Sequence, residues 1–154
     1  MTSILIALSN WLHALATVVF IGYFVLLALI YLPALSKTGN GATLSEISRR
    51  SRPWLYAALL VFIVTGTYLM LIDTGYLGFM NLGNLWGILM LVKHILVIGM
   101  ITMGFWFNAI LRVGPLMSSN TGAVQALARF RWYVNAMAIS GVLVLLLTAL
   151  AQAE

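Results

Sequence analysis

The chain has 154 residues, of which 63% are hydrophobic and only 7% are charged. Soluble domains carry roughly one quarter charged residues, so this composition excludes a soluble domain and predicts an integral membrane protein. The absence of cysteine excludes disulfides, iron–sulfur clusters, covalently attached c-type haem and thiolate metal sites. The net charge of +5 comes from unevenly placed residues, and it indicates membrane topology rather than affinity for nucleic acid.

Four apolar segments are each long enough to cross a bilayer, which requires about 20 residues. The first segment lacks the basic region of a cleavable signal peptide, so we expect it to remain as a span. Pro53 suits the first turn of the second helix. The sequence predicts an all-α integral membrane protein, in which residues 1–154 form one up-down bundle of four transmembrane helices. The expected spans are about 4–35, 53–72, 85–111 and 132–150.

Basic residues gather in the two connections that an up-down path places on the same side of the membrane. They are Lys37, Arg49, Arg50, Arg52, Arg112, Arg129 and Arg131. By the positive-inside rule this side is cytoplasmic. We therefore expect a protein of a bacterial-type inner membrane with both termini outside. Trp11 and Trp86 are expected at the outer interface, and Trp54 and Trp132 at the inner one.

His13 and His94 are the only histidines, and each lies about nine residues inside a span that starts at the outer face. At 1.5 Å per residue both imidazoles are expected about 13 Å below that face. The helical face of His13 also carries small and polar residues, so it is expected to point into the bundle. Two imidazoles at one depth match the axial ligands of a b-type haem. Interhelical hydrogen bonding is the simpler role of such histidines.

Lys93 is the only basic residue expected in the outer half, and a charge within a span is costly. We expect it to contact a haem propionate, or to extend to Asp73 or to lipid headgroups. Gly66 and Gly141 lie within a turn or two of the same depth and are predicted to admit a flat macrocycle. Glycines that only pack helices would show the same pattern.

Thioethers favour Cu(I), so the methionines near the third span allow a copper site as an alternative. Five of these are Met70, Met80, Met90, Met100 and Met103. Methionine is also common apolar filler, and this interpretation stays open. No acid lies within an expected span, and no Ser/His/Asp arrangement or phosphate-binding loop is present, so no catalytic residue is expected.

Several short motifs resemble the CopD-like (copper-resistance D) membrane domain family, and together they cover most of the chain. The motifs are Trp11-Leu12-His13-Ala14-Leu15, Gly22, Leu32-Pro33-Ala34-Leu35, Thr65-Gly66-Thr67-Tyr68-Leu69, Trp86-Gly87 to Lys93, and Asn108. This resemblance implies copper handling across the inner membrane, with His13 as the family's first-span histidine. The chain departs from the family at His94, where an apolar residue is expected, and at Asn135, where an acid is usual.

A second resemblance, to HemJ-type protoporphyrinogen oxidases, rests on Tyr31-Leu32-Pro33 and Arg131-Trp132-Tyr133, and it implies tetrapyrrole chemistry. The added histidine His94 suits a haem better than copper passage. We therefore predict haem b between His13 and His94, with electron transfer near the outer face. The expected partners are the lipid bilayer and other membrane subunits, and the chain is expected to be an electron-transfer or accessory subunit rather than a stand-alone enzyme. The alternatives are a copper transport or binding protein and a cofactor-free structural subunit.

Overall fold

The computed structural model describes residues 2–34, 41–73, 85–110 and 123–153, and within these ranges every residue except Asp73 and Ala153 is helical. Four of the helices are long and apolar enough to cross a membrane. The prediction of an all-α membrane bundle of four helices is confirmed. The elements are α1 (Thr2–Leu26), the π-helix η1 (Leu27–Tyr31) that continues it, α3 (Gly41–Ile72), α4 (Leu85–Ile110) and α6 (Ala123–Gln152).

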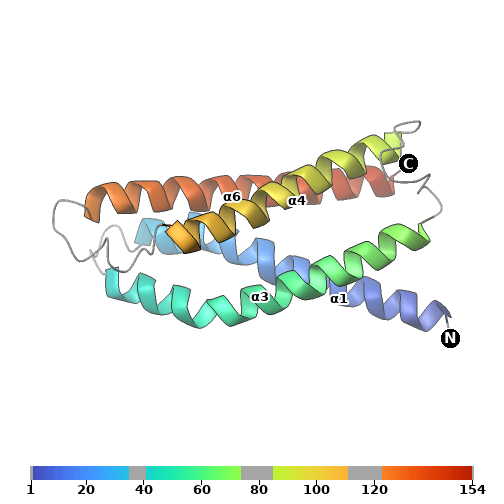
Figure 1. Ribbon diagram of the computed structural model, residues 1–154, viewed down its shortest axis with the longest axis horizontal. Helices are drawn as coiled ribbons and strands as arrows, with labels where there is room; N and C mark the ends of the chain where they lie inside the picture. Colours follow the sequence, from blue (N-terminus) through green and yellow to red (C-terminus); the bar gives the residue numbers. More distant parts are fainter. Residues whose placement is uncertain (1, 35–40, 74–84, 111–122, 154) are drawn as a thin grey trace.

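The helices pack in two pairs that are joined through α1 (Figure 1). Helix α1 packs along α3, α4 packs along α6, and both α1 and η1 also contact α6. Among the described helices, α3 and α4 have no comparable contact. The order around the bundle is therefore α3, α1, α6, α4, which places α1 diagonally opposite α4 and leaves the side between α3 and α4 least packed.

The two ends of the bundle differ in charge. The start of α1 and the end of α6 lie together at one end, which we call the terminus end (Figure 1). The starts of α3 and α6 lie at the opposite end, which we call the arginine end because it carries Arg49, Arg50, Arg52, Arg129 and Arg131. Lys37 and Arg112 fall outside the described residues. The expected separation of basic residues from the termini is thus present along the bundle axis.

Three of the tryptophans expected at the interfaces lie on the exposed surface. Trp11 near the terminus end is 61% exposed, and Trp54 and Trp132 near the arginine end are 73% and 68% exposed. Aromatic rings of this kind occupy the headgroup level of a bilayer.

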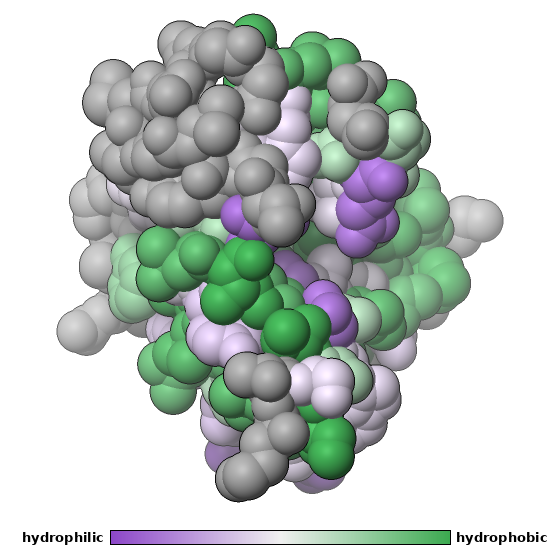
Figure 2. All heavy atoms as spheres, turned by 90° about the vertical axis from the view of Figure 1, so that its right-hand side faces the viewer, coloured by the Kyte–Doolittle hydropathy of each residue, from purple (hydrophilic) through white to green (hydrophobic). Residues whose placement is uncertain are grey.

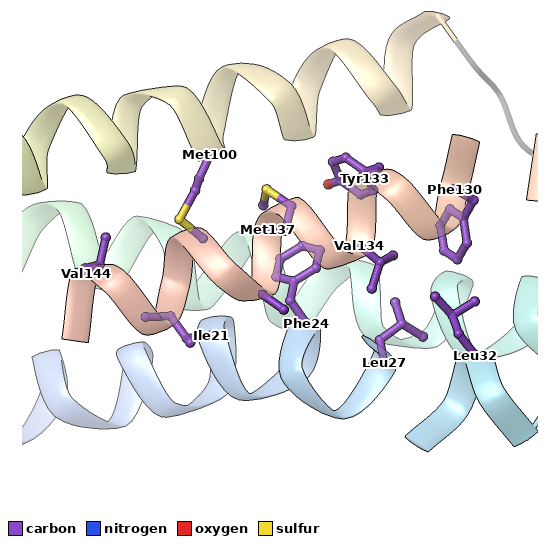
Figure 3. Close-up of a cluster of buried hydrophobic side chains, with 11 residues drawn as sticks. Ile21, Phe24, Leu27, Leu32, Met100, Phe130, Tyr133, Val134, Met137 and Val144 are labelled. Atoms are coloured by element: carbon purple, nitrogen blue, oxygen red, sulfur yellow. The ribbon is translucent and has the colours of Figure 1, made fainter. Parts of the chain in front are cut away.

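The main apolar core extends from Phe130 near the arginine end past the middle of α6 to Val144 (Figure 3). It joins α1 and η1 to α6 and includes Met100 of α4, and Val134 and Met137 are 0% and 1% exposed. A smaller cluster of Ala16, Ala58 and Phe62 packs α1 against α3. The core comprises Ile21, Phe24, Leu27, Leu32, Met100, Phe130, Tyr133, Val134, Met137, Ala138 and Val144.

Two helices begin earlier than the sequence predicted. Helix α3 begins at Gly41 and contains Pro53 in its interior, so the prediction that Pro53 opens this helix is wrong. Glu46 accepts hydrogen bonds from Arg49 at 2.7 Å and from Arg50 at 2.6 Å, pairs that support a helix outside the membrane. Helix α6 likewise begins at Ala123, before the predicted span 132–150, and ends at Gln152. Both helices thus include residues that precede the apolar segments marked by hydropathy.

The first span contains a π-helical turn that hydropathy does not predict. The N–H of Leu32 bonds to the carbonyl of Leu27, which closes a wider turn than in an α-helix. Pro33 follows this turn. Proline has no N–H, and in a regular helix its ring would meet the carbonyl four residues before it. The wider turn relieves that clash, and the helix continues to Ala34.

Candidate cofactor site

A cavity of about 830 Å³ lies toward the terminus end of the bundle. Residues of all four helices line it, and most come from α3 and α4, which pack against each other less than α1 packs against α3 or α4 against α6. Figure 2 looks onto this end and shows hydrophilic residues gathered near its middle, between apolar residues of the surrounding helices. Pockets for small molecules and cofactors typically measure about 300–1,000 Å³, so the cavity has the size of a cofactor site.

The two histidines both line this cavity, although they come from helices at opposite corners of the bundle. His13 lies on α1 and His94 lies on α4, and both side chains are half-buried. The structure therefore brings together the two residues that the sequence singled out. Their ligation of a metal stays a prediction.

The His13 ring lies against one face of α3. It stacks on Phe62 with ring centroids 4.6 Å apart and planes inclined by 22°, and its Nδ1 lies 3.0 Å from Oγ1 of Thr65. A Cβ atom at Gly66 would lie 2.9 Å from Cε1 of His13. Gly66 lines the cavity, but the space that its missing side chain leaves is filled by the imidazole rather than left for a macrocycle. The three residues occupy one helical face at i, i+3 and i+4.

The His94 ring is held by its own helix. Its Nδ1 lies 2.6 Å from the carbonyl oxygen of Met90, one turn earlier. A carbonyl oxygen only accepts, so Nδ1 carries a proton, and in the neutral ring Nε2 keeps its lone pair. Metal-binding histidines usually donate their second ring N–H to such an acceptor. His94 is therefore in the form that offers Nε2 to a metal.

Lys93 supplies a positive charge to the same cavity. Its side chain is half-buried and lies close enough to His13 to interact with it electrostatically. Asp73 also lines the cavity, so a contact between Lys93 and Asp73 stays a prediction. Asn10 and Gln152 add polar groups to the cavity wall. An anionic group in the cavity would compensate the lysine charge.

Gly141 has a different environment from Gly66. It is buried between α6 and α1, where an added Cβ would lie 2.7 Å from Cγ2 of Ile21, and it is not among the residues that line the cavity. The structure gives Gly141 a role in close helix packing, where a small residue lets two backbones approach. The prediction of a cofactor contact finds no support in this position.

The methionines divide between the cavity and the core. Met70 and Met90 line the cavity, whereas Met100 is buried in the core and Met103 packs against it. Met80 falls outside the described residues. Within the described ranges no group of three or more His, Asp or Glu residues is close enough to hold a metal.

No role for Phe62 or Thr65 was predicted from the sequence. A threonine in an apolar span was visible in the sequence, but its partner lies on another helix, and helical periodicity gives no information about contacts between helices. No protein-family model, no curated protein and no solved structure matches this chain. The resemblances to CopD-like and HemJ-type proteins therefore stay predictions.

Proposed function

We propose that this protein binds a b-type haem in the cavity, with His13 and His94 as the axial ligands. The observation that carries the proposal is that the only two histidines, from diagonally opposite helices, line one cavity of about 830 Å³. The two imidazoles would supply the nitrogen ligands of the haem iron. A bound haem would supply reversible one-electron transfer.

The polarity of the cavity suits the two parts of a haem. Phe62, Val97 and Ile101 offer an apolar wall to the macrocycle, and Lys93 offers a positive charge to a propionate. Asn10 of α1 and Gln152 at the end of α6 both line the cavity toward the terminus end. The propionate edge would therefore face the terminus end, and electrons would enter or leave there.

The charge distribution supports an orientation for this electron transfer. The arginine end is cytoplasmic by the positive-inside rule, so the termini and the haem edge face outward in a bacterial-type inner membrane. Only 6% of the α4 span is buried in this chain, against 33% of the α6 span. Helix α4 thus offers a surface to lipid or to another membrane subunit, and we place the protein as an electron-transfer subunit of a larger complex.

A reduced-minus-oxidised visible spectrum of the purified full chain tests the haem. We expect the sharp bands of a low-spin haem with two imidazole ligands, lost in both His13→Ala and His94→Ala. Thr102→Ala is the matched control, because Thr102 is an exposed residue of α4 that does not line the cavity. A colourless wild-type protein that does not take up added haem would refute the proposal.

Copper is the second candidate, because Met70 and Met90 line the cavity together with both histidines. Imidazole and thioether groups are suitable ligands for Cu(I). This function predicts stoichiometric copper in a colourless reduced protein, lost in Met70→Leu and Met90→Leu as well as in the histidine variants. Haem binding through two imidazoles predicts that the methionine variants keep the cofactor. A protein that binds neither group and is stable only with other subunits would be a structural subunit.

A further inference from the structure

The hydroxyl group of Thr65 has its single proton committed to the backbone. Thr65 is buried, at 8% exposure, and its Oγ1 lies 2.6 Å from the carbonyl oxygen of Val61 and 3.4 Å from that of Phe62. Both carbonyl oxygens can only accept hydrogen bonds. The 2.6 Å contact is at the short end of the range for O–H···O bonds, so the hydroxyl proton lies in it.

The contact between Thr65 and His13 must then take its proton from the imidazole. Oγ1 of Thr65 lies 3.0 Å from Nδ1 of His13 and has only lone pairs left to offer. Nδ1 therefore carries the ring proton, and the neutral imidazole keeps its lone pair on Nε2. We infer that Thr65 is a positioning residue that fixes the tautomer of His13 and makes Nε2 its metal-binding atom. The inference about metal binding rests on the proposed haem function, whereas the tautomer does not.

The two histidines then have the same tautomer, with the proton on Nδ1, but different acceptors hold that proton. His94 donates its Nδ1–H to the main-chain carbonyl of Met90, and His13 donates to the side chain of Thr65. Each neutral ring then keeps its lone pair on Nε2, which is the atom that would bind the iron. The backbone of Phe62 is also a hydrogen-bond partner of His13, but Thr65 is its side-chain acceptor. This contact can therefore be removed by a substitution that leaves the backbone unchanged.

Thr65 also selects between the two orientations of the ring. Phe62 and Gly66 restrict the ring plane through stacking and close approach, but a ring turned by 180° occupies nearly the same space. The turned ring would place a carbon against Oγ1 of Thr65 and lose the hydrogen bond. The acceptor therefore decides which edge of the imidazole faces α3.

Thr65→Val tests the inference, because valine keeps the shape of threonine and removes the acceptor. Thr65→Ser retains the hydroxyl and should restore the wild-type behaviour. Thr102→Val is the matched control, since the Thr102 hydroxyl makes the same bond to a carbonyl four residues earlier but contacts neither histidine and does not line the cavity.

Imidazole ¹⁵N chemical shifts of the haem-free full chain, measured at a pH where the histidines are neutral, report the tautomer. We expect the Nδ1–H form of His13 in the wild type, in Thr65→Ser and in Thr102→Val, and a shift toward the Nε2–H form in Thr65→Val. An Nε2–H form in the wild type, or an unchanged tautomer in Thr65→Val, would overturn the inference. This measurement gives an answer whether or not the protein binds haem.

Haem titration of the same variants measures the consequence for the site. Loss of a group that orients a metal-binding histidine typically costs about 10–100-fold in affinity, so we expect a loss of that size in Thr65→Val and recovery in Thr65→Ser. If the wild type binds no haem, the proposed function fails and the ¹⁵N result still decides the role of Thr65. If haem binding depends on His13 but is equal in Thr65→Val and wild type, only the positioning role fails.

Discussion

Replacing Gly66 with alanine tests the contact between α3 and the His13 ring most directly. The new Cβ would lie 2.9 Å from Cε1 of His13, whereas ordinary contacts begin near 3.4 Å, so the ring must retreat by about 0.5 Å (3.4 − 2.9). Gly66 and Thr65 lie on the same helix, and a ring pushed away from one also leaves the other. The 3.0 Å bond to Thr65 would lengthen toward about 3.5 Å, where hydrogen bonds are weak.

The expected loss of stability in Gly66→Ala is small. Overpacking of a tight contact costs about 1–3 kcal/mol, and alanine regains about 1 kcal/mol of helix propensity over glycine. The net cost is about 0–2 kcal/mol, which a stable bundle tolerates. The effect on the cofactor is expected to be larger, because the displaced ring also loses its orienting partner. We expect haem affinity to fall by about 10-fold or more.

Alanine substitutions at two other glycines are the controls. Unfolding and haem binding of each variant are measured in detergent, so that a loss of stability can be distinguished from a loss of haem affinity. In Gly141→Ala the new Cβ lies 2.7 Å from Ile21 but outside the cavity, so stability should fall while the folded protein keeps its haem affinity. In Gly99→Ala nothing lies within 4 Å of the new Cβ, so neither property should decline. Wild-type haem affinity in Gly66→Ala would refute the placement of His13 against α3.

Three further predictions concern the charge, the core and the topology. Lys93→Gln should weaken haem binding about 10–100-fold, because a hydrogen bond to a charged group contributes about 1.5–3 kcal/mol. Arg50→Gln removes the same charge at the arginine end and should bind haem normally, and equal affinity in both variants would contradict the propionate contact. Met137→Ala should lower the free energy of unfolding by about 2–5 kcal/mol without changing the haem affinity of folded protein, and an unchanged unfolding curve would contradict a core at this position. The chain has no cysteine, so Ser3→Cys and Arg50→Cys each introduce a single thiol for labelling with a membrane-impermeant reagent. Ser3→Cys should react in intact cells and Arg50→Cys only after lysis, and the reverse pattern would invert the proposed orientation.

The helix ends show where sequence reasoning was limited. The predicted third span starts at residue 85, where the description of α4 also starts. At Pro53 the two differ, because α3 extends through a charged segment that hydropathy assigns to a loop. The hydrogen bonds of Glu46 with Arg49 and Arg50 show that this segment has its own means of forming a helix.

Some residues of the candidate site were predicted from the sequence and others were found only in the structure. His13, His94 and Lys93 were selected from the sequence because polar groups are rare in apolar spans, and all three line the cavity. Thr65 and Phe62 were not selected, although they hold the His13 ring. Their role depends on which helix lies beside α1, and hydropathy gives no information about that choice.

The sequence alone identified an integral membrane protein with four spans and with its arginines separated from its termini. It also selected the two histidines as candidate ligands. These properties depend on quantities that run along the chain, namely hydropathy, charge and the rise of 1.5 Å per helical residue. The tertiary structure decided what lies beside each residue at a given depth. Gly66 and Gly141 both lack a Cβ and have similar expected depths, yet Gly66 lies against the His13 ring and Gly141 lies against Ile21. That difference arises from the lateral packing of separate helices, which only the contacts between their side chains determine.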